Sequence, residues 1–376
     1  MKIVIDKDIP FIHRVLERDA DVVYLPGRDI SRGDLADADA MIIRTRTRCD
    51  ATLLKGTKVK FIASATIGFD HIDTAFCREN NIQWTNAEGC NSSSVQQYIT
   101  AALFHLAKKL QFRLAGKTIG IVGVGNVGSK VAAVCSTLGM RVLLNDPPRE
   151  RLEGSGTFVS LNTIVRESDI ITFHVPLNRE GVDKTFHMID DKFLASLKKH
   201  QILINSSRGE IADTRALRMA LKAKTFVASV LDVWENEPDI DLDLLGLVDI
   251  GTPHIAGYSA DGKANGTAMS VRAISKFFGL GLDDWFPEEI PSPQDTVITV
   301  DCRDLESETV VGMLVRHTYD IMGDDRRLRN SPRTFEKQRA DYPLRREFPT
   351  YAVRLLQPKN NFGSLIKKIG FTISIS

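Results

Sequence analysis

The chain has 376 residues, a length that suits two or three domains. Because 43% of the residues are hydrophobic, each domain can bury a core. Its 49 Lys and Arg residues nearly balance 48 Asp and Glu residues, and the net charge of +1 favours a small-molecule partner over nucleic acid or a membrane surface. The five cysteines form no CxxC pair, so we expect neither a metal site nor a disulfide framework. No apolar stretch is long enough to span a bilayer, and we therefore expect a cytoplasmic setting.

Short apolar runs alternate with helical patterns in the first part of the chain. Strands that are separated by helices imply right-handed crossovers and a parallel sheet, so we expect a small α/β domain here. The expected strands are Lys2–Ile5, Val22–Leu25, Ala40–Arg44, Lys60–Ala65 and Ile82–Thr85.

A long amphipathic stretch follows Asn91 and runs to about Lys109, and we interpret it as a helix that connects two domains. The alternation of strands and helices then resumes, which predicts a doubly wound domain over residues 94–256. The expected strands are Thr118–Val122, Arg141–Asn145, Asp169–Val175, Gln201–Asn205, Phe226–Asp232 and Val248–Ile250.

A second long helix is expected at Ala260–Gly279, and it would complete the first domain if it packs back on the N-terminal sheet, with a cleft between the two lobes. The Pro-rich segment Trp285–Pro293 is typical of a linker. We therefore expect three domains: residues 1–93 with 257–285, residues 94–256, and a C-terminal α+β module over residues 286–376. The module's expected strands are Thr296–Val300, Tyr351–Leu356 and Phe371–Ile375, and its expected helices are Glu306–Met322 and Phe362–Ile369.

The glycines after the strand Thr118–Val122 predict a dinucleotide site. Gly123 allows a sharp turn out of the strand, Gly125 allows the backbone to approach a pyrophosphate, and Gly128 allows the next helix to pack closely. The amides of the first helical turn, which includes Asn126 and Val127, can then bind the anion. Asp146 ends the next strand, where a carboxylate accepts ribose hydroxyls and repels a 2'-phosphate, so we expect NAD rather than NADP. A purely structural turn would explain the glycines but not Asp146.

Three charged residues follow predicted strands of the same domain, at the sheet edge where ligands of such folds bind. They are Arg208, Glu237 and His254. Together they match the removal of a hydride from a 2-hydroxy acid, because His254 can take the hydroxyl proton, Glu237 can hold the imidazole and Arg208 can grip a carboxylate. Each residue alone has a structural alternative: a capping histidine, a surface arginine or a solvated loop carboxylate.

These motifs resemble the D-isomer-specific 2-hydroxyacid dehydrogenases over roughly residues 2–279. The resemblance rests on the glycine turn, Asn205-x-x-Arg208-Gly209, Asp232-Val233-x-x-x-Glu237-Pro238 and Pro253-His254-Ile255-Ala256-Gly257, together with Gly68–Asp73. Within the family, the opening residues 2–6, Tyr258 and the C-terminal module are most similar to a branch that oxidises a phosphorylated 2-hydroxy acid and dimerises through that module.

The resemblance implies a Rossmann-type NAD domain inserted in a smaller flavodoxin-like domain, and it implies roles for individual residues. Arg208, Glu237 and His254 would be catalytic. The residues implied to bind NAD are Gly123, Gly125, Asn126, Val127, Gly128, Asp146, Val175, Ser206, Ser207, Arg208, Asp232 and Gly257. The residues implied to bind substrate are Arg44, Thr45, Thr66 and Tyr258.

Two groups of arginines suggest how a phosphate is bound. Arg44, Arg46 and Arg48 would share one face if the strand Ala40–Arg44 continued through them, whereas a solvated edge is the alternative for the last two. Residues 324–348 hold eight basic and five acidic side chains, which favours a solvated face. A sharper hypothesis is that Arg345 or Arg346 crosses a dimer interface toward the partner's substrate.

Two other functions are compatible with the motifs. One is a sibling NAD-dependent dehydrogenase that acts on phosphoglycerate, glyoxylate or hydroxypyruvate, and the phosphate-binding arginines, Tyr258 and the third domain argue against it. The other is an NAD-sensing binding protein of the corepressor type, which can keep the same three charged residues.

Overall fold

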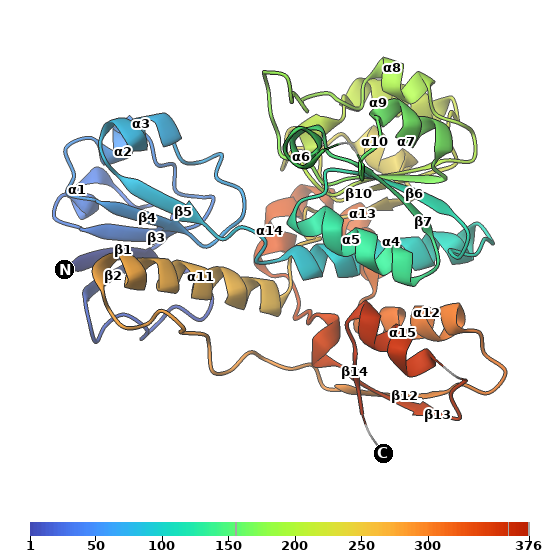
Figure 1. Cartoon of the computed structure of the whole chain (residues 1–376). Coiled ribbons are helices and arrows are strands. Elements are labelled where there is room, and N and C mark those ends of the chain that lie inside the picture. Colours follow the sequence, from blue (N-terminus) through green and yellow to red (C-terminus); the bar gives the residue numbers. More distant parts are fainter. Residues whose placement is uncertain (155, 360, 375–376) are drawn as a thin grey trace. The chain divides into compact units, whose positions relative to one another are not determined.

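The computed structural model describes residues 1–154, 156–359 and 361–374 (Figure 1). The chain forms two compact units: unit 1 comprises Met1–Asn91 and Ser259–Pro291, and unit 2 comprises Ser92–Tyr258 and Ser292–Ser376. Ile375, the expected end of the last strand, lies outside the described residues. In the described part of the chain, none of the helices combines the length and the apolar character needed to cross a membrane.

Unit 1 contains a five-stranded sheet in the order β2-β1-β3-β4-β5. All its strand pairs are parallel, and the strand order is the flavodoxin-like order that the family resemblance implies. The strands are β1 (Lys2–Asp6), β2 (Asp21–Leu25), β3 (Ala40–Ile43), β4 (Phe61–Ser64) and β5 (Gln83–Asn86), and the short helices are α1 (Arg32–Leu35), α2 (Ala51–Leu54) and α3 (Thr74–Glu79).

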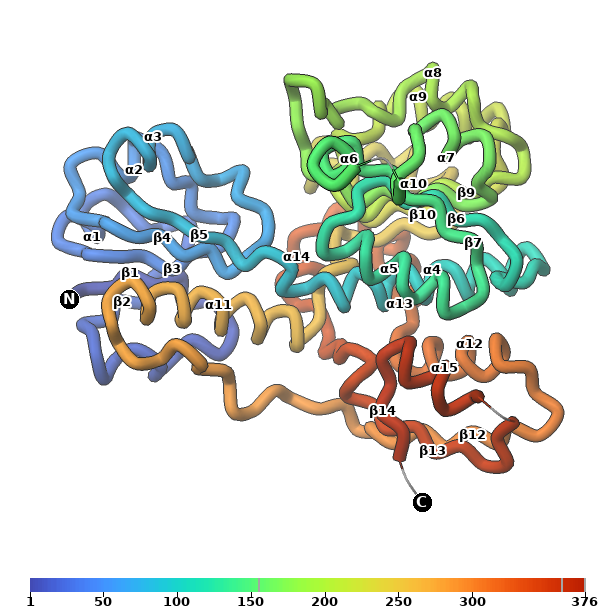
Figure 2. Tube along the Cα trace, in the orientation of Figure 1, coloured from blue at the N-terminus to red at the C-terminus, as the bar shows by residue number. Residues whose placement is uncertain are grey.

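Helix α11 (Ala260–Phe278) returns to the sheet of unit 1 and packs on β4 and β5 (Figure 2). The helix buries Val271 and Ile274 in the same cluster as Ile3 and Ile5. A Cβ at Gly266 would lie 2.6 Å from the carbonyl oxygen of the residue after β4, so the small residues of α11 permit this close approach.

Unit 2 is built on a six-stranded sheet in the order β11-β10-β9-β8-β6-β7, and all of its pairs are parallel. Beyond β7, Phe158 makes one parallel bridge to Leu144, so the third strand of a doubly wound sheet is reduced to a single residue pair. The strands are β6 (Thr118–Val122), β7 (Arg141–Asn145), β8 (Ile170–Phe173), β9 (Ile202–Asn205), β10 (Ala228–Leu231) and β11 (Ile250–Gly251).

The chain leaves β6 toward β7 and later returns to β8 on the other side of β6, which makes the carboxyl ends of β6 and β8 the topological switch point of the sheet. A nucleotide is expected at this point. The helices of this domain are α4 (Ser92–Lys109), α5 (Asn126–Thr137), α6 (Pro147–Glu153), α7 (Leu161–Glu167), α8 (Asp191–Ala195), α9 (Thr214–Lys222) and α10 (Leu242–Leu247), with a 3-10 turn at Gly209–Ile211.

The C-terminal module of unit 2 contains a parallel three-stranded sheet of β12 (Val297–Asp301), β13 (Ala352–Leu356) and β14 (Thr372–Ile373). Helices α12 (Ser307–Thr318) and α15 (Phe362–Ile369) lie on one face of this sheet, and they pack on α4 and α5 respectively (Figure 1). The module therefore shares a hydrophobic core with the helix that connects the domains and with the helix that follows the glycine turn.

Two predictions for the C-terminal module were wrong. The single helix expected at Glu306–Met322 is interrupted at Tyr319, whose extended backbone (φ −154°) brings its hydroxyl to 2.7 Å from Asp324 Oδ2, and α13 (Ile321–Asn330) then begins. Residues 324–348 are not simply the solvated face expected from their charges. They include most of α13, α14 (Phe335–Ala340) and the 3-10 turn Pro332–Thr334, and another 3-10 turn begins at their end, at Phe348–Thr350. Five of their charged residues are less than a tenth exposed: Asp324, Asp325, Arg345, Arg346 and Glu347.

Candidate active site

The glycine turn after β6 has the geometry that a dinucleotide requires. Gly123 has a φ of +87°, and a Cβ there would lie 2.5 Å from the carbonyl oxygen of His174. A Cβ at Gly128 would lie 2.0 Å from the carbonyl oxygen of Gly123, so α5 packs as closely on the turn as predicted. A Cβ at Gly125 would meet nothing within 4 Å, so the backbone is open on the side where a pyrophosphate would approach. The turn therefore fits a bound nucleotide.

Asp146 lies at the end of β7 and caps α6. Its Oδ2 accepts a hydrogen bond from Val124 N at 2.8 Å and its Oδ1 accepts one from Arg149 N at 3.1 Å, so the carboxylate is fixed beside the glycine turn. Each carboxylate oxygen can accept a second hydrogen bond. Asp146 therefore retains the capacity to accept two further hydrogen bonds, such as those of ribose hydroxyls.

A buried asparagine sets the position of Arg208 after β9. The Asn205 side chain accepts hydrogen bonds from Ser207 N (3.0 Å) and Ser207 Oγ (2.7 Å), and its amide donates to the Arg208 carbonyl oxygen at 2.9 Å. These bonds close a tight turn that leads into the 3-10 turn starting at Gly209. The sequence motif alone gave Asn205 no role, although an Asn at a strand end is a typical turn signal.

Gly209 brings the loops after β9 and β10 together. A Cβ at this position would lie 2.0 Å from the carbonyl oxygen of Trp234 and 2.5 Å from Glu235 N, so any larger residue would separate the two loops. Within the second loop, Trp234 N donates to Glu237 Oε1 at 2.9 Å, and the Trp234 indole donates to the Thr252 carbonyl oxygen at 2.9 Å. This packing places Glu237 near the loop that carries His254.

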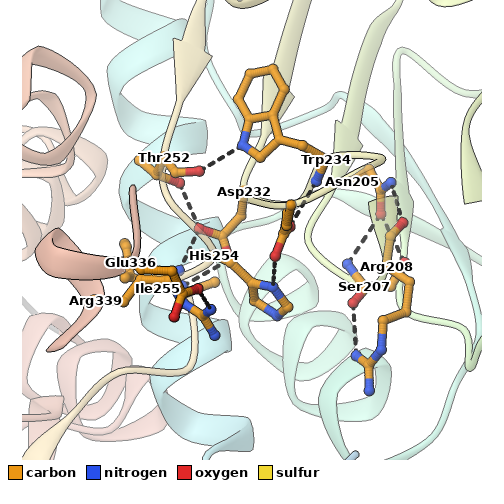
Figure 3. Close-up of polar contacts among 12 residues, drawn as sticks. Asn205, Ser207, Arg208, Asp232, Trp234, Thr252, His254, Ile255, Glu336 and Arg339 are labelled. Carbon is orange, nitrogen blue, oxygen red and sulfur yellow. Dashed lines mark hydrogen bonds and ion pairs between the residues drawn. The ribbon is translucent and has the colours of Figure 1, made fainter. Parts of the chain in front are cut away.

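Asp232, at the end of β10, holds the loop that carries His254 (Figure 3). Its Oδ1 accepts hydrogen bonds from Thr252 Oγ1 (2.6 Å) and Ile255 N (2.8 Å), and its Oδ2 accepts one from Ala256 N (2.9 Å). The backbone of His254 has a φ of +55°, which non-glycine residues rarely adopt. His254 N donates to the Asp232 carbonyl oxygen at 2.7 Å and lies 3.1 Å from that of Thr252, so backbone contacts on two sides fix the turn that presents the imidazole.

Glu237 and His254 form a hydrogen-bonded pair, with Glu237 Oε2 2.7 Å from His254 Nδ1. Burial would raise the pKa of Glu237. The charge and hydrogen bond of His254, the amide of Trp234 and the nearby charge of Arg339 outweigh this burial and leave the pKa below its usual value. Because Glu237 stays ionised it can only accept, so the hydrogen lies on Nδ1, and in the neutral imidazole Nε2 is the basic nitrogen.

The three expected catalytic residues lie together on one cavity of unit 2. This cavity has a volume of about 440 Å³, and Arg208, Glu237 and His254 all line it. Figure 3 shows Arg208 and His254 on neighbouring loops, and the Arg208 guanidinium donates to the Ser207 carbonyl oxygen at 2.9 Å. The cavity therefore brings a base, its carboxylate partner and a guanidinium within reach of one small molecule.

The other residues expected to bind the cofactor lie on the same edge of the sheet. Val175 follows β8 and would lie 2.8 Å from a Cβ at Gly123, so it forms one side of the turn. Ser206 has a buried hydroxyl without a hydrogen-bond partner in the described structure. Asp232 differs from the expectation, because the residue is 1% exposed and its carboxylate is bonded to three groups of the His254 loop.

The residues expected to bind substrate are divided between the two units. In unit 1, Thr45 lines a separate cavity of about 430 Å³ together with Arg48 and His71. Thr66 Oγ1 lies 2.9 Å from Ser64 Oγ at the end of β4. The list is completed by a residue of unit 2: the ring of Tyr258 packs edge-on against Tyr342 at 5.8 Å and beneath the guanidinium of Arg339 at 5.6 Å.

The predicted arginine face in unit 1 was wrong, because β3 ends at Ile43 and the chain turns before the second arginine. Arg44 is instead paired with two carboxylates, Asp6 Oδ2 at 2.9 Å and Asp8 Oδ2 at 3.3 Å. Arg48 pairs with Asp50 at 3.0 Å. The charge of Arg44 is therefore partly compensated before any phosphate binds.

The hypothesis that Arg345 reaches across a dimer interface was also wrong. Its side chain is 5% exposed, and its guanidinium is hydrogen-bonded within the same chain to Ser94 and to the carbonyl oxygen of Ala256. Arg346 is buried as well, at 9% exposed. The arrangement of charges along the sequence gave no sign of these buried contacts.

Comparisons with known proteins agree with this geometry. Residues 91–256 match the NAD binding domain of D-isomer specific 2-hydroxyacid dehydrogenases, and residues 292–370 match a domain of unknown function. Two solved structures share the fold. The first is a D-lactate dehydrogenase from Aquifex aeolicus in complex with NAD and lactic acid. It is 27% identical with a TM-score of 0.60, and the match covers 78% of this chain and 100% of that one.

The second structure is an NAD⁺-bound 3-phosphoglycerate dehydrogenase from Entamoeba histolytica. It is 25% identical with a TM-score of 0.63, and the match covers 77% of this chain and 99% of that one. The shared fold confirms the predicted fold class, and the matched NAD binding domain together with the NAD in both neighbours confirms the predicted cofactor.

The relatives with the higher identities bear one name. Proteins named erythronate-4-phosphate dehydrogenase are 53% identical in Bacteroides fragilis (94% of this chain and 99% of the relative), 44% identical in Porphyromonas gingivalis (94% and 95%) and 40% identical in Tolumonas auensis (100% and 100%). The sequence motifs were most similar to this branch, and that prediction is confirmed. The chain belongs to the erythronate-4-phosphate dehydrogenase family, whose NAD binding domain is that of the D-isomer specific 2-hydroxyacid dehydrogenases.

Proposed function

We propose that this chain oxidises erythronate 4-phosphate to 2-oxo-3-hydroxy-4-phosphobutanoate with NAD, as a step in pyridoxal phosphate biosynthesis. The relatives that cover nearly the whole chain support the substrate. The observation that carries the chemistry is the 2.7 Å hydrogen bond between Glu237 and His254, on a cavity that Arg208 also lines.

His254 acts as the base in this proposal. Because Glu237 holds Nδ1, the free electron pair of the neutral ring lies on Nε2, which takes the proton of the C2 hydroxyl. The carboxylate of Glu237 then stabilises the imidazolium that forms. Arg208 binds the substrate carboxylate, since a planar guanidinium can donate two parallel hydrogen bonds to it.

NAD supplies the acceptor for the hydride that leaves C2. Its pyrophosphate would be held by the turn of Gly123, Gly125 and Gly128 and by the first amides of α5, and its ribose by Asp146. Further contacts would come from Val175, Ser206, Ser207, Arg208 and Gly257. Asp232 retains one acceptor position, on Oδ2, so we propose that it serves the cofactor site mainly by holding the His254 loop.

We propose the same roles for the domains that the sequence predicts. Residues 94–256 would bind NAD, while residues 1–93 and 257–285 would bind substrate through Thr45, Thr66 and Tyr258. Arg44 remains a candidate for the phosphate, although a phosphate would have to compete with Asp6 and Asp8 for its guanidinium.

We also propose that the protein is a cytoplasmic homodimer joined through residues 286–376. Parallel sheets are usually covered on both faces, but the outer face of β12 exposes Val297, Thr299 and Asp301. On β13, Arg354 and Leu356 are exposed beside them. Light scattering of the wild type and of Val297→Asp tests this, and a wild-type monomer would contradict it.

The experiment that tests the activity is NADH formation with erythronate 4-phosphate, compared with 3-phosphoglycerate. We expect a much higher kcat/KM for erythronate 4-phosphate. The variant His254→Gln should lose about 10²- to 10⁴-fold in turnover and keep its affinity for NADH, because a positioned base contributes that much to the rate. Absence of turnover with every 2-hydroxy acid, alongside NAD-dependent binding of a partner, would favour an NAD-sensing protein instead.

A further inference from the structure

Among the Lys and Arg residues of the C-terminal segment (residues 292–370), Arg345 is the most deeply buried. The proposed chemistry gives it no role. Its side chain is 5% exposed, and its guanidinium carbon lies 4.5 Å from the ring centroid of Tyr319. The Nη2 atom donates to the carbonyl oxygen of Ala256 at 2.5 Å and to that of Ser94 at 3.3 Å, and it also contacts Ser94 Oγ. One side chain of the C-terminal segment thus joins two distant parts of the NAD-binding domain.

Both of these parts lie next to positions where the chain changes units. Unit 2 begins at Ser92, close to Ser94, and the chain leaves it after Tyr258, close to Ala256. The Ser94 hydroxyl also donates directly to the Ala256 carbonyl oxygen at 2.9 Å. Arg345 therefore reinforces a contact that already ties the start of α4 to the loop after β11.

The loop after β11 carries His254. On its inner side the amides of Ile255 and Ala256 are bonded to the Asp232 carboxylate. On its other side the Ala256 carbonyl oxygen is bonded to Arg345. The two residues that follow His254 are therefore fixed by Asp232, which belongs to the NAD-binding domain, and by Arg345, which does not.

The same segment supports the strand that precedes this loop. Asp325 Oδ1 accepts a hydrogen bond from Gly251 N at 2.8 Å. Arg329 pairs with Asp325 at 2.9 Å and donates to the carbonyl oxygens of Leu245 and Val248 at 2.6 Å and 2.8 Å. Buried charges are retained only where such bonds compensate their desolvation, so these contacts fix β11 and the segment to each other.

We propose that Arg345 is a positioning residue for the reaction: it fixes the loop that presents His254 to Glu237, and it gives the domain of unknown function at residues 292–370 a part in catalysis. This inference rests on the proposed function for its kinetic readout. Arg345 acts through the geometry of the Glu237–His254 pair and not through contact with the substrate or NAD.

The test uses the full chain with Arg345→Met, which removes the charge and every donor, and with Arg345→Lys, which keeps the charge and one donor group. Arg326→Met is the matched control for loss of an arginine in the same segment, because this side chain on α13 is 62% exposed and pairs with the exposed Asp320. We expect Arg345→Met to lose roughly tenfold to a hundredfold in turnover per NADH-binding site, the range that a misplaced catalytic group produces. Arg345→Lys should recover part of this loss, and Arg326→Met should match the wild type.

Two readouts separate positioning from simple loss of folded protein. A smaller folded fraction lowers turnover and NADH stoichiometry together and leaves the pH profile of kcat/KM unchanged. A displaced His254 instead moves the acidic limb of that profile, because its bond to Glu237 changes, while NADH affinity stays within about twofold. Unchanged turnover per NADH site with an unmoved limb would overturn the proposal.

Hydrogen exchange measured by mass spectrometry tests the same inference without substrate. In Arg345→Met, peptides that contain the amides of Ile255 and Ala256 should exchange faster, whereas peptides from the glycine turn should not change. Ser94→Ala, which removes one bond to Ala256, should give a smaller effect in the same peptides and serves if Arg345→Met does not fold. Unaltered exchange in both Ser94→Ala and Arg345→Lys would also overturn the proposal. If the wild type shows no turnover but the variants still show these exchange changes, only the proposed activity is refuted.

Discussion

Replacing Gly125 by Ala should weaken NAD binding without destabilising the protein. Gly125 precedes α5 with an extended backbone (φ −76°, ψ −151°) and no positive φ, and a Cβ there would meet no atom within 4 Å. The methyl group would occupy the open side of the turn, where the pyrophosphate is expected to approach. Alanine restricts the unfolded chain, which stabilises by about 0.4–1 kcal/mol, and it is a poorer N-cap than glycine by a similar amount. The net change in stability should therefore be close to zero.

The loss of cofactor affinity should be much larger. A methyl group that keeps the pyrophosphate away from the turn removes at least one hydrogen bond from a backbone amide to a charged oxygen. Such a bond contributes about 1.5–3 kcal/mol, which corresponds to roughly 10- to 100-fold in the Kd for NADH.

Gly128→Ala is the matched control, because it adds the same methyl group on the opposite side of the turn. Its Cβ would lie 2.0 Å from the Gly123 carbonyl oxygen, so α5 would have to move away from the turn. Overpacking of this kind costs about 1–3 kcal/mol or more, against a helix-propensity gain of about 1 kcal/mol from Gly to Ala. We expect the steric cost to win, and Gly128→Ala should melt at a lower temperature than the wild type.

The assay is fluorescence titration with NADH alongside thermal unfolding of both variants. The expected pattern is weak binding with an unchanged melting temperature for Gly125→Ala, and a lowered melting temperature for Gly128→Ala. If Gly125→Ala binds NADH within about twofold of the wild type, the pyrophosphate does not approach this turn and the reasoning fails.

Three further predictions follow from the surroundings of single side chains. Glu237→Gln should lower kcat by about 10²-fold or more while NADH affinity is retained, because the imidazolium loses its carboxylate; steady-state kinetics with near-normal kcat would contradict this. Asp146→Ala should weaken NAD binding by roughly 10- to 100-fold and leave NADP binding nearly unchanged, as the Kd values of the two cofactors would show. Burial lowers the pKa of His174 to about 3, so the folded protein keeps this ring neutral while the unfolded chain protonates it below pH ~6.5. The contribution of the neutral ring to the free energy of unfolding is complete above that pH and falls by about 1.4 kcal/mol per pH unit as the pH drops toward 3. Urea titrations should therefore show that the free energy of unfolding decreases between pH 7 and pH 5 by about 2 kcal/mol less in His174→Asn than in the wild type.

The strands of both large sheets could be predicted because buried parallel strands are continuous apolar runs between turn signals. The predicted bounds of Thr118–Val122 and Arg141–Asn145 agree with β6 and β7. The other bounds differ by a few residues at strand ends, as at Asp169–Val175, where β8 ends at Phe173 and the loop toward the cofactor begins. Apolar residues continue into that loop because they also pack beside the glycine turn.

The site could be predicted in part, because its residues follow strands of a parallel sheet and must therefore meet at one edge. Arg208, Glu237 and His254 were proposed in this way, and they line one cavity. The roles of Asn205 and Gly209 could not be predicted, since both depend on how two loops pack against each other. The alternation expected for Arg44, Arg46 and Arg48 failed, because nothing in the local sequence shows that β3 ends at Ile43.

The charges of residues 324–348 show most clearly what a sequence pattern leaves open. A mixture of acidic and basic side chains at helical spacing is compatible with a solvated surface and with a buried network, because either can place opposite charges next to each other. Here the difference lies in partners that are distant in sequence: Asp325 is bonded to Gly251 N, and Arg345 is bonded to the carbonyl oxygen of Ala256. An aspartate or arginine can leave water only when such fixed dipoles are already in place. The burial of these two charges is therefore a property of the loop that carries His254 as much as of the segment that supplies them.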